Sequence, residues 1–198
     1  MLKKILLGLL GIIVLAVIIS FFLPSKIHIE RSTEINAPVE TIFEQVAVTK
    51  KNEAWSPWKE MEPTSVQTYE GPESGVGSKM SWKGEKLGEG TQTTTMMEPN
   101  KAIQQELDFK GQGKAMSGWK FEPGTNGATK VTWYLDEDLG MNPIPKLMMA
   151  TFVNMDKIMG EQFEKGLANL KKVSESTPAT ATMDSTATQP SAEVAPAK

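Results

Sequence analysis

The stretch that decides the fold is residues 145–173, PKLMMATFVNMDKIMGEQFEKGLANLKKV. Its large apolar residues follow one another at steps of three or four positions: Met148, Phe152, Met155, Met159, Phe163, Leu167 and Leu170. At about 100° per residue they form a single apolar stripe along a long helix. A helix this one-sided needs an apolar surface to cover. The residues that precede it alternate between apolar and polar types, which predicts a β-sheet in that role.

Two features of the stripe favour a helix that lines a cavity over one that only fills a core. The stripe is rich in Met, the adaptable residue of apolar sites that accept varied ligands. Asp156 projects about 40° from the centre of the stripe, where a core helix would not carry a carboxylate. In a closed apolar cavity the pKa of this carboxyl would rise. The alternatives are an ion pair with a sheet residue such as Arg31, or a position at a solvent-exposed rim.

The composition argues against several functional classes. The chain has 198 residues, a formal net charge of −3, no Cys and one His. Without Cys it has no disulfide framework, no thiolate nucleophile and no Cys-ligated zinc. A single His argues against a His-based metal site and against a Ser-His-Asp triad. The mild negative charge argues against nucleic-acid binding, which usually depends on a basic patch. We therefore expect no metal, no cofactor and no nucleic-acid partner.

The N-terminal run from Ile5 to Leu23 contains no charged residue. As a helix it would span roughly 28 Å, which is close to the hydrocarbon thickness of a bilayer. Lys3 and Lys4 precede the run, so the positive-inside rule keeps the N-terminus in the cytoplasm. A cleaved signal peptide is the rival interpretation, but no small-x-small cleavage site follows. We expect residues 1–25 to be an uncleaved anchor in the cytoplasmic membrane, with the remainder on the periplasmic or extracellular side.

The middle of the chain predicts a strand, two helices and then six strands. Residues 26–35 alternate as a half-buried strand, with His28 on its solvent side. Pro38 opens a helix, and residues 53–58 predict a short second helix that is stopped by its proline, Pro57. From residue 66 to residue 136, short alternating runs are separated by Gly, Pro and Asn, which implies an antiparallel meander. Asp136, Glu137 and Asp138 have the composition of a solvated strand end. Residues 174–198, rich in Ser, Thr, Pro and Ala, predict a disordered tail.

The order of these elements resembles that of the START-like superfamily, together with three short motifs. The motifs are Asn36-Ala37-Pro38-Val39-Glu40 followed by Phe43, Trp55-Ser56-Pro57-Trp58, and Gly160 followed by Phe163-Glu164, Gly166-Leu167 and Leu170-Lys171. More narrowly, the chain is similar to the polyketide cyclase/dehydrase and lipid-transport branch, also known as SRPBCC domains. The resemblance covers about residues 26–173. It implies an α+β helix-grip fold, in which a curved antiparallel sheet of about seven strands wraps around the long C-terminal helix. It carries over no catalytic residue, because the branch has no universal catalytic motif.

The resemblance also implies a hydrophobic ligand, since members bind lipids, sterols, polyketides or related molecules. The residues expected to line the cavity are Trp58, Met80, Trp82, Gln105, Phe109, Trp119, Trp133, Phe152, Met155, Asp156, Met159 and Phe163. The ordinary alternative, which is favoured for the Trp residues taken singly, is a core residue without ligand contact. We expect a membrane-tethered binding domain for a hydrophobic small molecule or lipid. Two alternatives stay open: an enzyme of the cyclase/dehydrase type that uses Asp156 with Arg31 or Gln105, and an interaction module whose own side chains fill the cavity.

Overall fold

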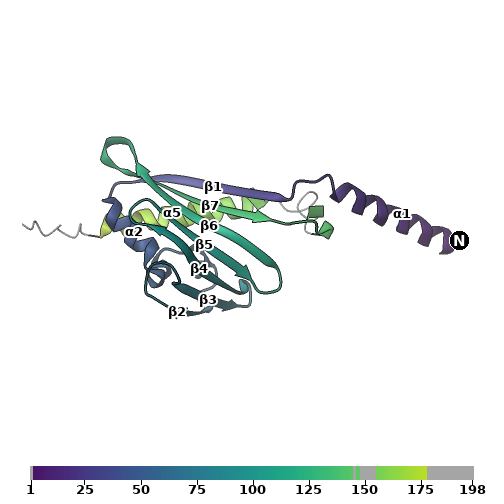
Figure 1. The fold of residues 1–198 in the computed structure, drawn as a ribbon, viewed down its shortest axis with the longest axis horizontal. Helices are drawn as coiled ribbons and strands as arrows, with labels where there is room; N and C mark the ends of the chain where they lie inside the picture. Colours follow the sequence, from purple (N-terminus) through teal and green to yellow (C-terminus); the bar gives the residue numbers. More distant parts are fainter. Residues whose placement is uncertain (1, 145, 148–154, 178–198) are drawn as a thin grey trace, which may run out of the picture.

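A computed structural model of the chain describes residues 2–144, 146–147 and 155–177. Within them, one seven-stranded antiparallel sheet has the strand order β1-β7-β6-β5-β4-β3-β2 (Figure 1). The strands are β1 Lys26–Ile35, β2 Val66–Glu70, β3 Lys79–Gly84, β4 Gly88–Glu98, β5 Ala102–Phe109, β6 Gly113–Pro123 and β7 Thr129–Asp138. The helices are α1 Leu2–Ser20, α2 Val39–Ala47, η1 Thr49–Ala54, α3 Pro57–Met61, η2 Thr125–Gly127 and α5 Met155–Ser176.

The predicted helix-grip fold is confirmed. The chain forms β1, then short helices, then six strands in a meander, then the long helix α5, which lies along one face of the sheet (Figure 1). We call the face that α5 covers the inner face, and the opposite one the outer face. Phe163 of α5 stacks on Trp133 of β7, with ring centroids 4.1 Å apart, which fixes the face that the helix covers.

The hairpin turns follow from their residues. Asn100, at the β4–β5 turn, has a φ of 60°, a left-handed conformation that Asn tolerates better than most residues. The β3–β4 turn is fixed from outside by Glu62, which follows α3. Its buried carboxylate accepts hydrogen bonds from the backbone N–H groups of Glu85, Lys86 and Leu87. These N–H groups, that of Leu87 first, lower the pKa of the Glu62 carboxyl.

The core lies between the sheet and the helices α2 and α5. Ile42 and Val46 of α2 are fully buried, as are Leu167 and Leu170 of α5. Gly166 lets α5 approach closely, because a Cβ there would lie 2.7 Å from the ring of Trp133 and 3.0 Å from Pro57. The apolar stripe predicted from the spacing of residues 163–170 is therefore the packing face of the helix.

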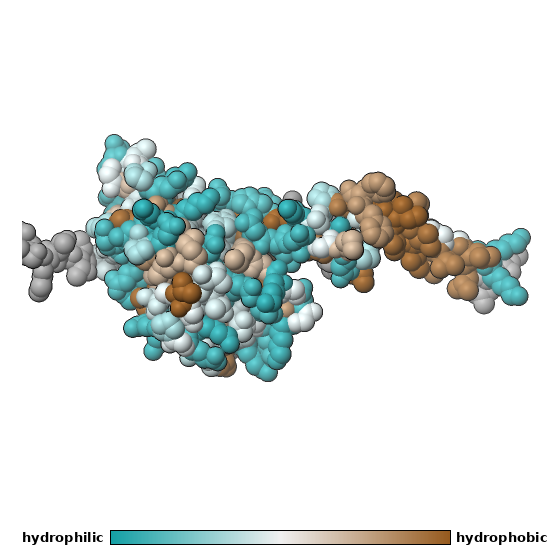
Figure 2. Space-filling model, in the orientation of Figure 1, coloured by the Kyte–Doolittle hydropathy of each residue, from teal (hydrophilic) through white to brown (hydrophobic). Residues whose placement is uncertain are grey.

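Apart from Lys3 and Lys4 in its first turn, α1 is apolar all round. It extends away from the sheet, roughly in line with β1 (Figures 1 and 2). Its residues Lys3–Ser20 are long and apolar enough to cross a membrane, with a mean hydropathy of 2.3. The helix ends at Ser20, three residues before the predicted end at Leu23. By length and composition α1 fits either a membrane anchor or a signal sequence.

The C-terminal end of the domain differs slightly from the prediction. α5 continues to Ser176, whereas we expected the helix to end at residue 173, and Ser174 is fully buried. The low-complexity composition that begins at residue 174 therefore starts inside the last turn of the helix. The predicted disordered tail, from residue 178 onward, lies outside the described residues. So does most of the predicted helical stretch at 145–154, although residues 143–144 and 146–147 are helical.

Candidate functional site

The inner face is crossed by rows of side chains that the strand register places side by side. The row of Val131 and Phe121 lies at the α2 end, where Phe121 meets Phe43 of α2, and four further rows follow it. From the α2 end toward the α1 end they are Trp133, Trp119 and Ile103; then Leu135, Ser117, Gln105 and Thr94; then Glu137, Ala115, Leu107, Gln92 and Met80; then Phe109, Gly90 and Trp82. The six sheet residues predicted to line a cavity all lie on this face. Since α5 lies on the same face, the predicted strand and helix residues are brought to one side of the sheet.

The row of Trp133 and Trp119 is packed solid by aromatic rings. Trp119 and Trp133 stack with centroids 4.5 Å apart, and Phe163 stacks on Trp133 at 4.1 Å. Trp55 meets both indoles edge-on, at 5.4 and 6.0 Å. The indole N–H of Trp133 donates to the hydroxyl of Ser117 at 3.0 Å. Because Trp119 and Phe163 are 2% and 1% exposed, this end of the inner face is filled by the protein's own side chains.

The two rows nearest α1 are more open. Met80, Trp82, Leu107 and Phe109 are only half-buried although all four are large and apolar. Trp82 and Phe109 meet edge-to-face at 5.8 Å across β4. They can do so because Gly90 lies between them, and a Cβ at that position would collide with the Trp82 ring. We call these four residues the open end of the inner face.

Three further predicted residues have the same intermediate burial. Met155 and Met159 on α5 and Trp58 on α3 are half-buried and pack against the edge of the core. Phe152, the remaining aromatic candidate, lies outside the described residues.

Gln105 is a buried polar residue whose side chain has no partner among the described residues. It is 3% exposed, and among the described residues its amide makes no hydrogen bond. Among the described residues, two side-chain atoms are fully enclosed and have no hydrogen-bond partner, Asn52 Oδ1 and Ser174 Oγ. The amide atoms of Gln105 are not among them. The amide of Gln105 therefore borders a space that a water-sized molecule reaches.

Glu137 is a site residue that the sequence interpretation missed. We expected residues 136–138 to form a solvated strand end, and Asp136 and Asp138 are indeed exposed. Glu137, however, is half-buried on the inner face, next to Ala115 and Ile27. Within the described residues it has no hydrogen bond or ion pair, and burial raises the pKa of its carboxyl. The alternation that places Val131, Trp133 and Leu135 inward, continued by one step, would have identified it.

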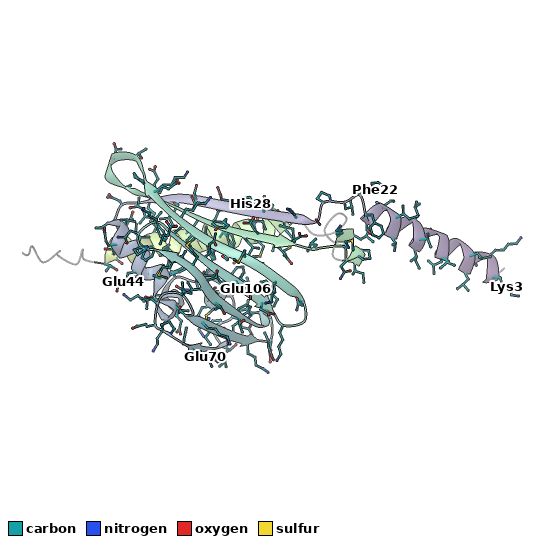
Figure 3. The ribbon with its side chains drawn as sticks, in the orientation of Figure 1. Lys3, Phe22, His28, Glu44, Glu70 and Glu106 are labelled. Carbon is teal, nitrogen blue, oxygen red and sulfur yellow. The ribbon has the colours of Figure 1, made fainter. Side chains whose placement is uncertain are left out.

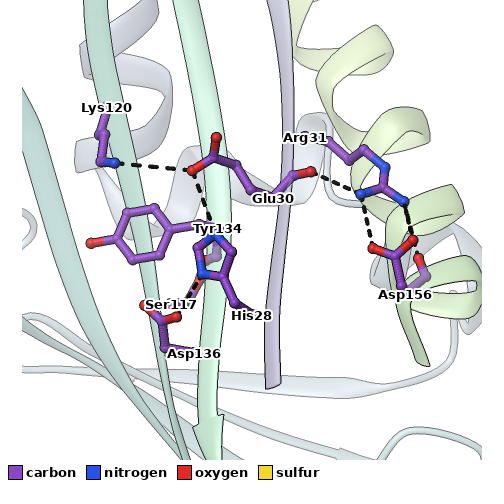
Figure 4. Close-up of polar contacts among 8 residues, drawn as sticks. All are labelled: His28, Glu30, Arg31, Ser117, Lys120, Tyr134, Asp136 and Asp156. Carbon is purple, nitrogen blue, oxygen red and sulfur yellow. Dashed lines mark hydrogen bonds and ion pairs between the residues drawn. The ribbon is translucent and has the colours of Figure 1, made fainter. Parts of the chain in front are cut away.

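Asp156 does not occupy a closed apolar cavity, and the pKa that such a cavity would raise is lowered instead; the alternative of an ion pair with Arg31 is the one observed. Its side chain is 65% exposed and pairs with Arg31 of β1 through two N–O contacts of 3.1 Å (Figure 4). The Arg31 guanidinium lowers the pKa of the Asp156 carboxyl. Arg31 also donates to the Asp156 backbone carbonyl and to Glu164. The guanidinium fits against α5 because Gly160 has no side chain.

The outer face carries charged pairs. Successive residues of β1 point to opposite faces, so that Glu30 faces outward toward Lys120 while Arg31 faces α5 (Figure 4). His28 also lies on the outer face, as predicted, and its Nδ1 is 2.7 Å from a carboxylate oxygen of Asp136. An open concavity of about 610 Å³ at the α1 end of the sheet is lined by charged residues of both signs, including Lys114, Glu106 and Asp138. Ile27, Ala115 and Glu137 also line it.

Among the described residues, no group of three or more His, Asp or Glu side chains is placed to hold a metal ion. The candidate site is therefore the open end of the inner face together with Gln105 and Glu137. Chemically it offers an apolar surface, one amide that can donate or accept, and one carboxyl group with a raised pKa.

Solved structures share this fold. Protein CV1439 from Chromobacterium violaceum is 15% identical, covers 78% of this chain and 99% of its own, and superposes with a TM-score of 0.53. The Aha1 dimer from Colwellia psychrerythraea is 15% identical, with coverage of 75% and 96% and a TM-score of 0.51. Ara h 8.0201 is 12% identical, with coverage of 77% and 99% and a TM-score of 0.54. At these identities the likeness establishes the fold alone.

Sequence comparison identifies the family. A search of curated proteins found no significant match. The sequence profile described as polyketide cyclase/dehydrase and lipid transport matches residues 26–175, which is the whole of the sheet and nearly all of α5. Profile and fold agree with the resemblance drawn from the order of elements. The chain belongs to the polyketide cyclase/dehydrase and lipid transport family.

Proposed function

We propose that this protein is a membrane-tethered binding domain that holds a hydrophobic small molecule or lipid between the open end of the inner face and α5. The observation that carries the proposal is the half-burial of Met80, Trp82, Leu107 and Phe109 beside the unpartnered amide of Gln105. Apolar surface left in contact with water forgoes about 25 cal/mol per Å². A ligand that covers these four side chains would recover that free energy.

Gln105 supplies the polar part of such a site. The amide has no protein partner among the described residues, and a hydroxyl or carbonyl group of the ligand would take the place of the water that reaches it. Ligand pockets are commonly apolar with a few placed polar groups that fix orientation. We therefore expect a ligand with an apolar body and at least one hydroxyl or carbonyl oxygen.

The tether in this proposal is α1. Its side chains are exposed along nearly its whole length, as expected of a helix whose partner is lipid (Figure 2). Lys3 and Lys4 favour a cytoplasmic N-terminus, which would place the domain on the outer side of the cytoplasmic membrane. Protease added outside spheroplasts should then degrade the domain. A mature protein that begins near Lys26 would instead identify α1 as a cleaved signal sequence.

The binding proposal is tested on residues 26–177. This fragment should fold alone, because α1 makes only isolated contacts with the described elements and the buried core runs from Ile29 to Leu170. The fragment, purified without detergent, is analysed by native mass spectrometry and by titration with a fluorescent fatty-acid analogue. We expect a co-purified hydrophobic molecule and saturable binding of the analogue.

Two variants sharpen the test. Trp82→Ala should weaken binding of the analogue, whereas Val66→Ala, at an exposed position of the neighbouring strand β2, should not. Gln105→Leu should retain apolar ligands and lose preference for those that carry a hydroxyl group. A bare protein mass in every preparation, with no binding of the analogue, would refute the proposal and favour the interaction module.

An enzyme acting on the bound molecule is the second candidate, and Glu137 is the observation that favours it. A half-buried carboxyl with a raised pKa, in the same row as Leu107 and Met80, is suited to proton transfer. In that case Glu137→Gln should abolish turnover of the co-purified molecule and leave its binding intact. Asp156 is not a candidate for this role, because its carboxylate is exposed and paired with Arg31.

A further inference from the structure

Four large apolar side chains are exposed around the junction of α1 and the domain. Phe21 and Phe22 follow α1 and are 60% and 85% exposed, and Met141 and Ile144 follow β7 and are 80% and 67% exposed. The label of Phe22 in Figure 3 marks the junction. We call these four residues the junction surface. Other exposed apolar residues of the domain, such as Val76 between β2 and β3, lie elsewhere.

The two parts of the junction surface are held together by the backbone. The N–H of Leu139 donates a hydrogen bond of 2.8 Å to the carbonyl of Ser25. Met141 is two residues from Leu139 and Phe22 is three residues from Ser25. Since each residue spans at most about 3.6 Å, Met141 and Phe22 both lie at the α1 end of the domain. Figure 1 agrees, because the segment after β7 lies beside the end of α1.

The chain leaves little distance between this surface and the end of α1. Only residues 21–25 separate Ser20 from β1, and five residues reach at most about 18 Å. A domain tethered in this way cannot move its junction away from the lipid headgroups. The residues from Leu139 to Ile144 carry no charge, so burying them at the headgroup boundary would desolvate no ionised side chain of that segment.

We propose that the junction surface inserts into the bilayer that α1 spans, at the boundary between lipid headgroups and acyl chains. The proposal rests on the tether of the proposed function and deepens it. Glu137 and Phe109 lie on the α1 side of the inner face, and Glu137 is two residues from Leu139. The open end of the inner face therefore adjoins the bilayer, and a hydrophobic ligand exchanges with the membrane without crossing bulk water.

The absence of Cys makes a direct test possible. Met141→Cys, Ile144→Cys and the control Val76→Cys each place a single thiol for an environment-sensitive fluorophore on an exposed residue of the full chain. The chains are reconstituted in nanodiscs of phosphatidylcholine and phosphatidylglycerol, with and without doxyl-labelled phosphatidylcholine. We expect blue-shifted emission and several-fold stronger quenching at positions 141 and 144 than at position 76.

Two results would overturn the proposal, and they differ in meaning. Equal quenching at positions 141, 144 and 76 in chains that remain in the discs would reject the junction surface and leave the tether intact. Failure of every labelled chain to co-elute with the discs would reject the tether as well. A Met141→Ser, Ile144→Ser double variant provides a second measurement. It should remain in the discs and bind the free fluorescent fatty-acid analogue normally, but take up the same analogue from vesicles several-fold more slowly than the unmodified chain.

Discussion

Replacing Phe163 by alanine removes one layer of the aromatic stack that closes the α2 end of the inner face. Phe163 is 1% exposed and its ring lies parallel to that of Trp133 at 4.1 Å. A phenylalanine that leaves water buries about 200 Å², which is worth roughly 5 kcal/mol at 25 cal/mol per Å². Alanine keeps the part of this free energy that the Cβ contributes, and the surrounding side chains fill the vacated space only in part. We therefore expect the free energy of unfolding to fall by about 3–5 kcal/mol.

The loss is measured by urea unfolding of residues 26–177, followed by tryptophan fluorescence. Ile158→Ala is the matched control on the same helix, because Ile158 is 52% exposed and should change stability by less than about 0.5 kcal/mol. The vacated volume also adjoins the row that holds Gln105, so the variant should bind longer hydrophobic ligands than the unmodified domain. A loss below about 1 kcal/mol in Phe163→Ala would mean that the stack does not close this end.

Three further predictions concern charged and close-packed positions. Glu137→Gln should be more stable than the unmodified domain at neutral pH, because burial raises the pKa of the Glu137 carboxyl. The difference in stability should vanish in acid, where Glu137 is protonated in both the folded and the unfolded state, and a difference independent of pH would contradict this. Asp156→Asn should remove a small stabilisation by the ion pair with Arg31. That stabilisation is present above the ordinary Asp pKa and is lost as pH falls through the lowered pKa of Asp156. Unfolding curves from pH 7 to pH 2 would reveal it. Gly160→Ala should push the Arg31 guanidinium away from α5 and destabilise the domain, and its effect should shrink in an Arg31→Ala background; equal effects in both backgrounds would show that the contact is not the cause.

The fold could be predicted because its signals are local and periodic. The steps of three and four from Met155 to Leu170 identify α5, and the alternation of Thr129, Val131, Trp133 and Leu135 identifies β7. Turn residues such as Asn100 divide the meander into strands. The order of these elements then specifies the helix-grip arrangement, which the sheet topology confirms.

The site was only partly predictable, because its details depend on contacts between distant residues. Helical spacing gives the angle of Asp156 but does not reveal that Arg31, 125 positions away, faces it across the missing side chain of Gly160. Nor does the sequence distinguish the filled end of the inner face from the open end. Trp133 and Trp82 look alike as aromatic residues of alternating strands, yet one stacks on Phe163 and the other is half-buried.

The alignment of α1 with β1 has a mechanical consequence. The hydrogen bonds of an antiparallel ladder lie perpendicular to the strands, and β1 is paired with β7 from Lys26 to Ile35. α1 continues roughly along the axis of β1 (Figure 1). In the proposed membrane-tethered state, a pull on α1 therefore loads the ladder in shear. The bonds then share the force, whereas a pull across the strand would open them one at a time. Bending and lateral flow of a membrane should therefore move the domain as a rigid body before they peel its edge strand away.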